Sequence, residues 1–174
     1  MNEVSMIDGH IDRAECHILD SGDRTQFPSG AVRDMQKGKG RCDLMPLDII
    51  SQLLCSKTLS DLDKFQNSSD VDDLYATLNY FVEMHDEWND LTDMILDVAK
   101  HFEEGAEKYG EDNWKKGLPV KNYINSAVRH FLKWVRNDQD EPHDRAFCWN
   151  IICAIWTCEH IPELNDYARG DVEC

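Results

Sequence analysis

"LTDMILDVAKHFEEGAEKYG" (residues 91–110) decides the fold class of this chain. Its apolar residues recur at spacings of three and four, and they are Leu91, Ile95, Val98, Ala99 and Phe102. This spacing places them on one face of an α-helix. Gly105 and Gly110 stand near the expected end of that helix. We therefore predict an amphipathic helix that packs against a core.

The same helical period recurs on both sides of this stretch. Before it, "LDIISQLLC" (residues 47–55) predicts one helix, and the residues after Asp70, an expected N-cap, predict a second. After it, "VKNYINSAVRHFLKWVRN" (residues 120–137) predicts another, and a last helix is expected from Asp140–Pro142 to about His160. No segment shows the two-residue alternation of a β-strand. The sequence therefore predicts an all-α helical bundle.

The N-terminal segment differs in composition from the rest of the chain. Residues 1–28 are polar and weakly periodic, and they run into the turn-rich "SGDRTQFPSG", so we predict a mobile N-terminal arm followed by a single all-helical domain over residues 29–174. The N-terminus has neither the basic nor the apolar region of a secretory signal, and no run approaches the roughly 20 apolar residues of a membrane span. We expect a cytoplasmic protein without a membrane partner.

The charge and the cysteines restrict the possible functions. The formal net charge is -16, from 34 acidic against 18 basic residues. Such a chain is a poor candidate for nonspecific nucleic-acid binding, so no nucleic-acid partner is expected. Anionic ligands remain possible where local bases or a divalent ion reverse the field. The seven cysteines are odd in number and lack C-x-x-C spacing, which argues against a disulfide framework and a structural zinc site and favours a reducing compartment.

The densest positive segment of the chain is "GAVRDMQKGKGRC" (residues 30–42). It interleaves bases with glycines, and the bases are Arg33, Lys37, Lys39 and Arg41. Glycines allow backbone N–H groups to approach an oxyanion closely, and the bases supply positive charge. The segment is not a P-loop, because G-K-[ST] is missing. Two interpretations stay open, a phosphate-binding loop and a solvated basic loop.

Polar residues also fall on helix faces that a core would use. His143 and Asn150 lie two turns apart on one face of the last helix. On the preceding helix, the polar residues that share overlapping faces are Ser126, Arg129, His130, Lys133 and Arg136. Asp140 and Glu141 could simply cap the last helix and favour its dipole. We favour a polar site, because carboxylates with a carboxamide and an imidazole form a donor set that suits Mg²⁺ or Mn²⁺.

Three stretches together resemble a known family. "HFEEGAEKYGEDNWKKG" (101–117), "NSAVRHFLKW" (125–134) and "DEPHDRAFCWN" (140–150) closely resemble the phage dATP/dGTP diphosphohydrolases, relatives of the MazG-like all-α nucleoside triphosphate pyrophosphohydrolases. "GAVRDMQKGKGRCDLMPLD" (30–48) is similar to the N-terminal signature of that family. The resemblance implies a MazG-like helical bundle, homo-oligomeric, that uses Mg²⁺ or Mn²⁺ to cut purine deoxynucleoside triphosphates (dGTP, dATP) to monophosphates.

In phages that replace adenine with 2-aminoadenine, relatives of this kind supply dGMP. A phage-encoded protein of this family would work in the cytoplasm of the infected host cell. The resemblance makes residues 29–174 a nucleotide hydrolase domain, within which the long stretch 56–90 is expected to be a helical insertion.

The resemblance and the face pattern together give expected roles. The residues expected to act in catalysis are Glu103, Glu141 and His143. The expected metal ligands are Glu103, Glu107, Asp140, Glu141 and Asn150. The residues expected to bind substrate are Arg33, Lys39, Arg41, Lys108, Asn113, Trp114, Arg129, His130 and Lys133. The family pattern also contains His101 and Tyr109, and Tyr109 or Trp114 could stack on the purine, although Trp114 could equally belong to the core.

The chain departs from MazG-like enzymes in one motif. Those enzymes hold their metals with E-x-x-E on one helix and E-x-x-D on another. Glu104-x-x-Glu107 is present here, but Phe147 and Asn150 stand where the second motif would place its glutamate and aspartate. Either Asp140, Glu141 and His143 compensate from one turn earlier, or the metal is bound differently.

Three functions from different classes are consistent with these features. The first is metal-assisted hydrolysis, in which bases share the phosphate charge and a carboxylate or His143 accepts a proton from water. The second is a phage nucleotide-binding protein without turnover, a sponge for a signalling nucleotide, which the missing aspartate at position 150 favours. The third is an acidic helical interaction protein without metal dependence. The motif match favours the hydrolase.

Overall fold

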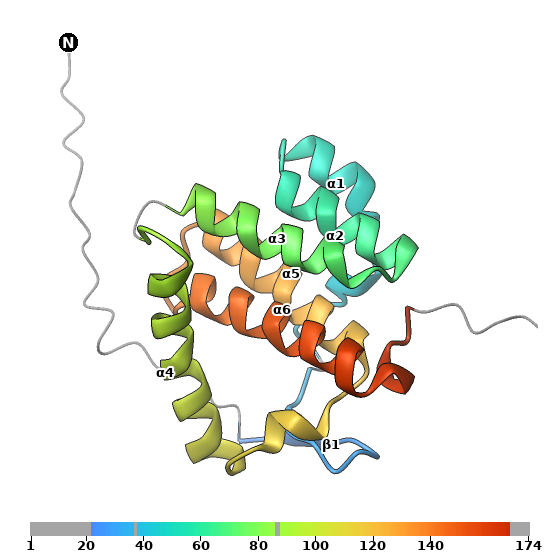
Figure 1. Cartoon of the computed structure of the whole chain (residues 1–174), viewed down its shortest axis with the longest axis vertical. Coiled ribbons are helices and arrows are strands. Elements are labelled where there is room, and N and C mark those ends of the chain that lie inside the picture. The colour runs from blue at the N-terminus through green and yellow to red at the C-terminus, as the bar shows by residue number, and fades with distance from the viewer. Residues whose placement is uncertain (1–21, 37, 86–87, 168–174) are drawn as a thin grey trace, which may run out of the picture.

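The computed structural model describes residues 22–36, 38–85 and 88–167 and confirms the predicted all-α bundle (Figure 1). Its α-helices are α1 (Leu47–Leu53), α2 (Lys57–Ser68), α3 (Val71–Met84), α4 (Leu91–Tyr109), α5 (Val120–Val135) and α6 (His143–His160). Three short 3₁₀ helices accompany them in the described residues: η2 (Cys42–Leu44) before α1, η3 (Asn113–Lys116) between α4 and α5, and η4 (Pro162–Leu164) after α6. Within the described ranges, no helix combines the length and the apolar character needed to cross a membrane.

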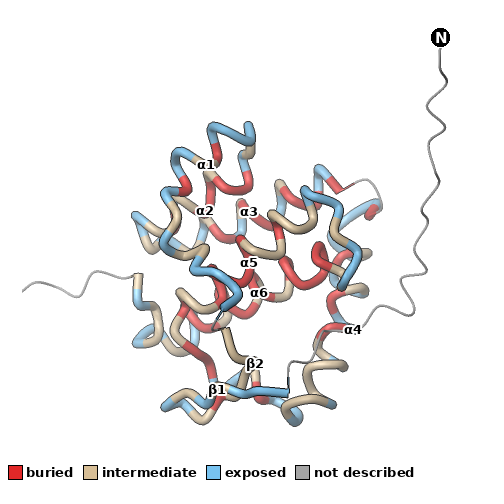
Figure 2. Tube along the Cα trace, turned by 180° about the vertical axis from the view of Figure 1, so that it is seen from behind, coloured by how far each residue is buried: buried red, intermediate tan, exposed pale blue. Residues whose placement is uncertain are grey.

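Helices α5 and α6 pack along each other at the centre of the bundle (Figure 1). Helix α3 packs against α6 and α2, and α1 packs against α2, while α4 lies against α6 on another side. Figure 2 shows the buried segments concentrated in the central helices and the exposed ones along the outer helices. The rings of Phe81, Phe131 and Phe147 meet where α3, α5 and α6 converge, with ring centroids 4.5 Å apart for Phe81 and Phe147. Burial of such side chains is the main force that holds the bundle together.

Side-chain caps fix where two of the helices begin. The carboxylate of Asp70 accepts a hydrogen bond from the backbone N–H of Asp72 at 3.0 Å, which confirms the predicted cap of α3. Asp90 caps α4 in the same way. Helix α6 instead begins directly after Pro142, and no side chain caps it. The capping role considered for the acids at 140 and 141 is therefore not observed.

Helix α2 was not predicted as a helix of its own. Ser56 caps it, since its hydroxyl accepts a hydrogen bond from the backbone N–H of Leu59. Only every third residue is a buried apolar one, and these are Leu59, Leu62 and Phe65. The carboxylate of Asp61 is buried among them, held by Lys57 and Lys64. The stretch 56–90 thus contributes fully buried side chains to the core in addition to extending the chain.

A short antiparallel hairpin is the second departure from the sequence-based expectation. Strand β1 (Arg24–Gln26) pairs with β2 (Val32–Asp34), and Gly30 turns the chain with φ +82°. Arg24–Gln26 belong to the expected N-terminal arm, whereas residues 1–21 lie outside the described ranges. Val32 gives the reason for the strand, because its backbone N–H and C=O both bond the side chain of Asn113. A partner 81 residues away leaves no local periodicity in the sequence.

Candidate active site

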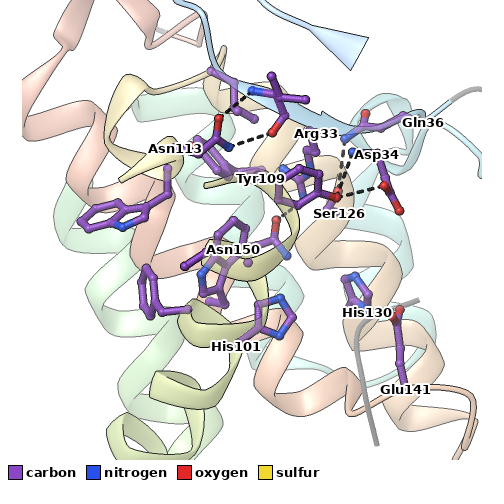
Figure 3. A pocket seen from close by; sticks show the side chains of 18 of the residues that line it. Arg33, Asp34, Gln36, His101, Tyr109, Asn113, Ser126, His130, Glu141 and Asn150 are labelled. Atoms are coloured by element: carbon purple, nitrogen blue, oxygen red, sulfur yellow. Dashed lines mark hydrogen bonds and ion pairs between the residues drawn. The ribbon is translucent and has the colours of Figure 1, made fainter. Parts of the chain in front are cut away.

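A cavity of about 700 Å³ opens between the hairpin and three helices (Figure 3). Strand β2 and the loop that follows form one wall, and the C-terminal half of α4 with η3 forms another. Helices α5 and α6 supply the rest of the lining. A volume of this size accommodates a ligand as large as a nucleotide.

One part of the lining is aromatic. Phe102 contacts Trp114 with ring centroids 5.2 Å apart, and Trp149 lies 5.9 Å from Phe102. His101 lies 5.2 Å from Trp149. Trp114 therefore lines the cavity and also packs against neighbouring rings, and its stacking on a purine stays a prediction. Flat aromatic surfaces of this kind suit a planar base.

Two half-buried arginines lie in the cavity wall, Arg33 on β2 and Arg129 on α5. Arg33 donates to the Oδ1 of Asn150 at 2.6 Å, and these two side chains point toward each other in Figure 3. Arg129 donates to the hydroxyl of Ser126 at 3.0 Å. The other terminal nitrogen, NH1, of each arginine is buried without a hydrogen-bond partner. Neither arginine forms an ion pair with another described residue.

The charge balance at these arginines points to an anionic ligand. Burial lowers the pKa of both guanidinium groups from their ordinary value, and the positive charge of Arg129 adds to this lowering at Arg33. A buried charge without a counter-ion is costly, and a phosphate supplies both the charge and the acceptors that a guanidinium needs. The cavity therefore fits a phosphate-bearing ligand.

Asp34 lies beside the arginines, but other bases already bind it. Its carboxylate accepts bonds from Arg24 at 2.8 Å, from Lys108 at 3.1 Å and from the hydroxyl of Tyr109 at 2.9 Å. Burial, with the negative charge of Asp34, raises the pKa of the Tyr109 hydroxyl, so Tyr109 stays a donor. Lys108, expected to bind substrate, instead holds β2 against α4. Because Arg24 and Lys108 already bind Asp34, its negative charge does not neutralise Arg33 and Arg129.

A second polar group, the histidine–glutamate cluster of His130, Glu141 and His143, stands where α5 meets the start of α6 (His130 and Glu141 in Figure 3). The Nδ1 atoms of His130 and His143 are 3.0 Å apart. The Oε1 of Glu141 lies 3.3 Å from the first of these nitrogens and 3.5 Å from the second. His130 and Glu141 line the cavity, whereas the side chain of His143 is only 1% exposed. Burial and the nearby Arg129 lower the pKa of His130 well below its ordinary value, so its imidazole stays neutral, the form that binds a metal.

Asp140 lies behind this cluster. Its Oδ1 is 2.7 Å from the Nε2 of His143, and its Oδ2 accepts from Lys133 at 2.6 Å. Desolvation raises the pKa of Asp140, but the hydrogen bonds from Lys133 and His143 together outweigh it and bring the pKa to about 2. Asp140 is therefore ionised at neutral pH and orients the His143 ring.

The glutamates of α4 lie apart from the histidine–glutamate cluster. Glu103 is exposed and lines the cavity, while Glu107 is exposed and does not. Glu104 binds Arg145 at 2.8 Å. Among the described residues, no group of acids and histidines close enough to share an ion includes Glu103 or Glu107. The expected five-residue ligand set is thus divided between two places.

The structure brings most of the expected site residues to one cavity. Those that line it are Arg33, Lys39, Glu103, Asn113, Trp114, Arg129, His130, Lys133, Glu141 and Asn150. Those outside the lining are Arg41, Glu107, Lys108, Asp140 and His143. Arg41 binds its neighbour Asp43 at the surface. The interpretation as a solvated basic loop therefore applies to Arg41, at the end of the basic segment. The interpretation as a phosphate-binding loop is supported by the position of Arg33 in the cavity wall.

Several lining residues were missed from the sequence. Gln36 donates to Ser126 at 3.2 Å and accepts from Asn125 at 3.0 Å, which fastens the loop after β2 to α5. Tyr123 and Trp149 lie under the guanidinium of Arg33, within 6 Å. The position of Ser126 on the same polar helix face as His130 could have indicated that Ser126 lines the site. No sequence pattern indicated that Gln36 does.

The fold and cavity define an all-α protein with a site suited to a ligand that carries phosphate and a planar group. The family model described as dATP/dGTP diphosphohydrolase, N-terminal, matches residues 86–167 and confirms the family resemblance seen in the motifs. The matched range contains α4, α5 and α6, which form most of the cavity, while the hairpin with Arg33 lies outside it. Comparisons with curated proteins and with solved structures gave no match.

Proposed function

We propose that the protein hydrolyses purine deoxynucleoside triphosphates to monophosphates with the help of a divalent metal ion. The observation that carries the proposal is the pair of half-buried arginines, Arg33 and Arg129, which line a nucleotide-sized cavity without carboxylate partners among the described residues and each keep one buried guanidinium nitrogen without a hydrogen-bond partner. The description of the matching family, dATP/dGTP diphosphohydrolase, supports this substrate class.

The cavity offers a place for each part of such a substrate. Arg33 and Arg129 bind the phosphate oxygens, with Lys39 adding charge from the loop after β2. The aromatic lining of Phe102, Trp114 and Trp149 receives the purine. Binding through both parts positions the phosphoanhydride bond between the arginines and the histidine–glutamate cluster.

The reaction needs a group that accepts a proton from the attacking water. Glu141 lines the cavity, with its carboxylate 3.3 Å from His130, and this carboxylate can accept that proton. The histidine–glutamate cluster also has the donor atoms to hold a divalent ion. Such an ion, when bound, neutralises phosphate charge and lowers the pKa of water. Glu103, exposed at the opposite wall, is available to a further ion that arrives with the substrate.

The test is a product analysis of the purified protein with dGTP, dATP and their ribose forms, each with Mg²⁺, Mn²⁺ or EDTA. Ion-exchange chromatography should show metal-dependent dGMP or dAMP. Arg129→Gln should lower kcat/KM by roughly 100-fold, since a charge-assisted contact to phosphate is worth about 2–3 kcal/mol.

The matched control is Arg136→Gln. Arg136 ends the same helix but is exposed and bound to Asp138, so this variant should hydrolyse substrate like the wild type. Intact triphosphate with every metal at high protein concentration would contradict hydrolysis. Tight nucleotide binding in that case would instead support the sponge.

A further inference from the structure

We propose that His130, Glu141 and His143 form a metal site that binds through two imidazole nitrogens and one carboxylate, in place of an all-carboxylate site on α4. The three donor atoms are separated by 3.0, 3.3 and 3.5 Å. Donor atoms bound to one ion at about 2.1 Å, at angles near 90–110°, lie roughly 3.0–3.4 Å apart. The spacing in the protein is therefore already that of neighbouring ligands around a common ion.

The surroundings of His143 fix which of its nitrogens is available. Its Nε2 lies 2.7 Å from the Asp140 carboxylate, which Lys133 holds from the other side at 2.6 Å. An ionised carboxylate only accepts, so Nε2 carries the proton and Nδ1 carries the lone pair. A carboxylate behind a histidine in this way is the usual support of a metal-binding imidazole.

The position of the cluster also suits an ion that takes part in a reaction. His143 is buried behind the wall, while His130 and Glu141 line the cavity. Three protein ligands on one side leave the remaining coordination positions directed at the cavity, where water or a phosphate oxygen can occupy them.

A second set of possible ligands nearby is less suitable. Asp138, Asp140 and His143 also lie close together. Asp138 is bound by Arg136, and the His143 nitrogen that faces this set is the one that donates to Asp140. An ion there would have to displace both contacts. Asp138 therefore offers a matched test of which set binds.

The ligand types predict the class of metal. Imidazole nitrogen suits transition-metal ions, Zn²⁺, Fe²⁺ and Ni²⁺ more than Mn²⁺, whereas Mg²⁺ prefers oxygen ligands and keeps much of its water. The expected choice between Mg²⁺ and Mn²⁺ is thereby narrowed to Mn²⁺ at this site. The catalytic meaning of the site depends on the proposed hydrolase function, but metal binding can be measured without it.

The experiment titrates Mn²⁺ into the full chain after EDTA treatment and dialysis, with calorimetry for affinity and pulsed EPR for ligand type. We expect one ion per chain, with nitrogen couplings from imidazole, and weak competition by Mg²⁺. His130→Ala should weaken binding at least about 100-fold, since loss of even an outer partner of a ligand costs roughly 10- to 100-fold. Asp138→Asn should bind like the wild type.

The possible outcomes test the proposed metal site and the proposed hydrolase function independently. Bound Mn²⁺ without imidazole couplings, or unchanged affinity in a folded His130→Ala, would overturn the site. The EPR measurement on the wild type decides the matter even where His130→Ala fails to fold. Imidazole-bound Mn²⁺ without any hydrolysis would support the site and contradict the hydrolase, whereas hydrolysis without such binding would do the reverse.

Discussion

His85 and Asp144 form a hydrogen bond inside the core, whereas His130, Glu141 and His143 form a similar polar group in the wall of the cavity. The Nε2 of His85 lies 2.8 Å from Asp144, and the His85 ring stacks on that of Trp88 at 3.9 Å. Both partners of this pair are buried on every side. Histidine–carboxylate contacts thus stabilise the fold in one place and line a cavity in the other. The surroundings of such a polar group, core or cavity, decide its role, and the residue types that form it do not.

The largest expected effect separates the two groups by activity. Glu141→Gln keeps the shape of the side chain but removes the carboxylate from the histidine–glutamate cluster, so hydrolysis of dGTP should fall by roughly 10²–10⁴-fold. Steady-state kinetics with Mn²⁺ measures this loss. Glu83→Gln makes the same change at an exposed position on α3 and should leave kcat unaltered. Equal activity of the wild type and Glu141→Gln would remove the distinction between the two groups.

The next effect concerns stability. His85→Phe keeps a ring in the core but removes the hydrogen bond to Asp144, so the free energy of unfolding should fall by about 2 kcal/mol. For a domain of this size, Tm should then drop by roughly 4–8 °C. Tyr75→Phe serves as a control, because it removes only an exposed hydrogen bond from Tyr75 on α3 to Glu159 on α6 and should change stability by less than about 0.5 kcal/mol. Nucleotide hydrolysis by folded His85→Phe should match the wild type, and a loss there would extend the site into the core.

The smallest effect is a pH dependence that arises in the cavity. His101 lines it, and burial, with the nearby charges of Arg145 and Arg33, lowers the pKa of its imidazole from 6.5 to about 3. Below pH 6.5 the unfolded chain takes up a proton that folded His101 refuses, so the free energy of unfolding should fall by about 1 kcal/mol per pH unit down to pH 3.

Urea unfolding at pH 7.5 and 5.5 measures this contribution. His101→Gln should lose about 1 kcal/mol less than the wild type between the two values. His160→Gln, at an exposed position at the end of α6, should follow the wild type. Identical pH dependence of wild type and His101→Gln would show that the His101 side chain is hydrated in the folded protein.

The sequence predicted those features of the fold that depend on residues close to one another in the chain. The cap at Asp70 depends on neighbours within one turn and was found, and α4 was predicted as a helix. The core-facing side predicted for α4 was wrong at Leu91, Ile95 and Ala99, which are exposed, because the helix buries Met94, Val98 and His101 instead. Helix α2 was missed because it has only three buried apolar residues among charged ones, and Ser56, its cap, is weak evidence when considered alone. The hairpin was missed because Asn113, which satisfies the backbone of β2, is far away in the chain.

The site divides in the same way. Arg129 and His130 were singled out from the polar faces of one helix and Glu141 from the start of the next, and the three side chains line the same cavity. Arg33 was found from charge density, but its contact with Asn150 spans 117 residues and could not be predicted. The family motif placed a metal on α4, whereas Glu104 is bound to Arg145 in the structure. Ion pairs between different helices decide which acids remain available to bind a metal ion. Such pairs cannot be predicted from the spacing of residues within one helix.

The attachment of the hairpin has a consequence for how the protein folds. The helices of the bundle make many contacts between near neighbours in sequence, whereas β2 docks through Asn113 and Asn150, 81 and 117 residues away. Long loops close late, because their entropic cost must be met before any contact is gained. Arg33 therefore reaches its position only after α4, α5 and α6 have assembled. We expect nucleotide binding to lag behind helix formation during refolding, so that activity reports the last step of folding rather than the first.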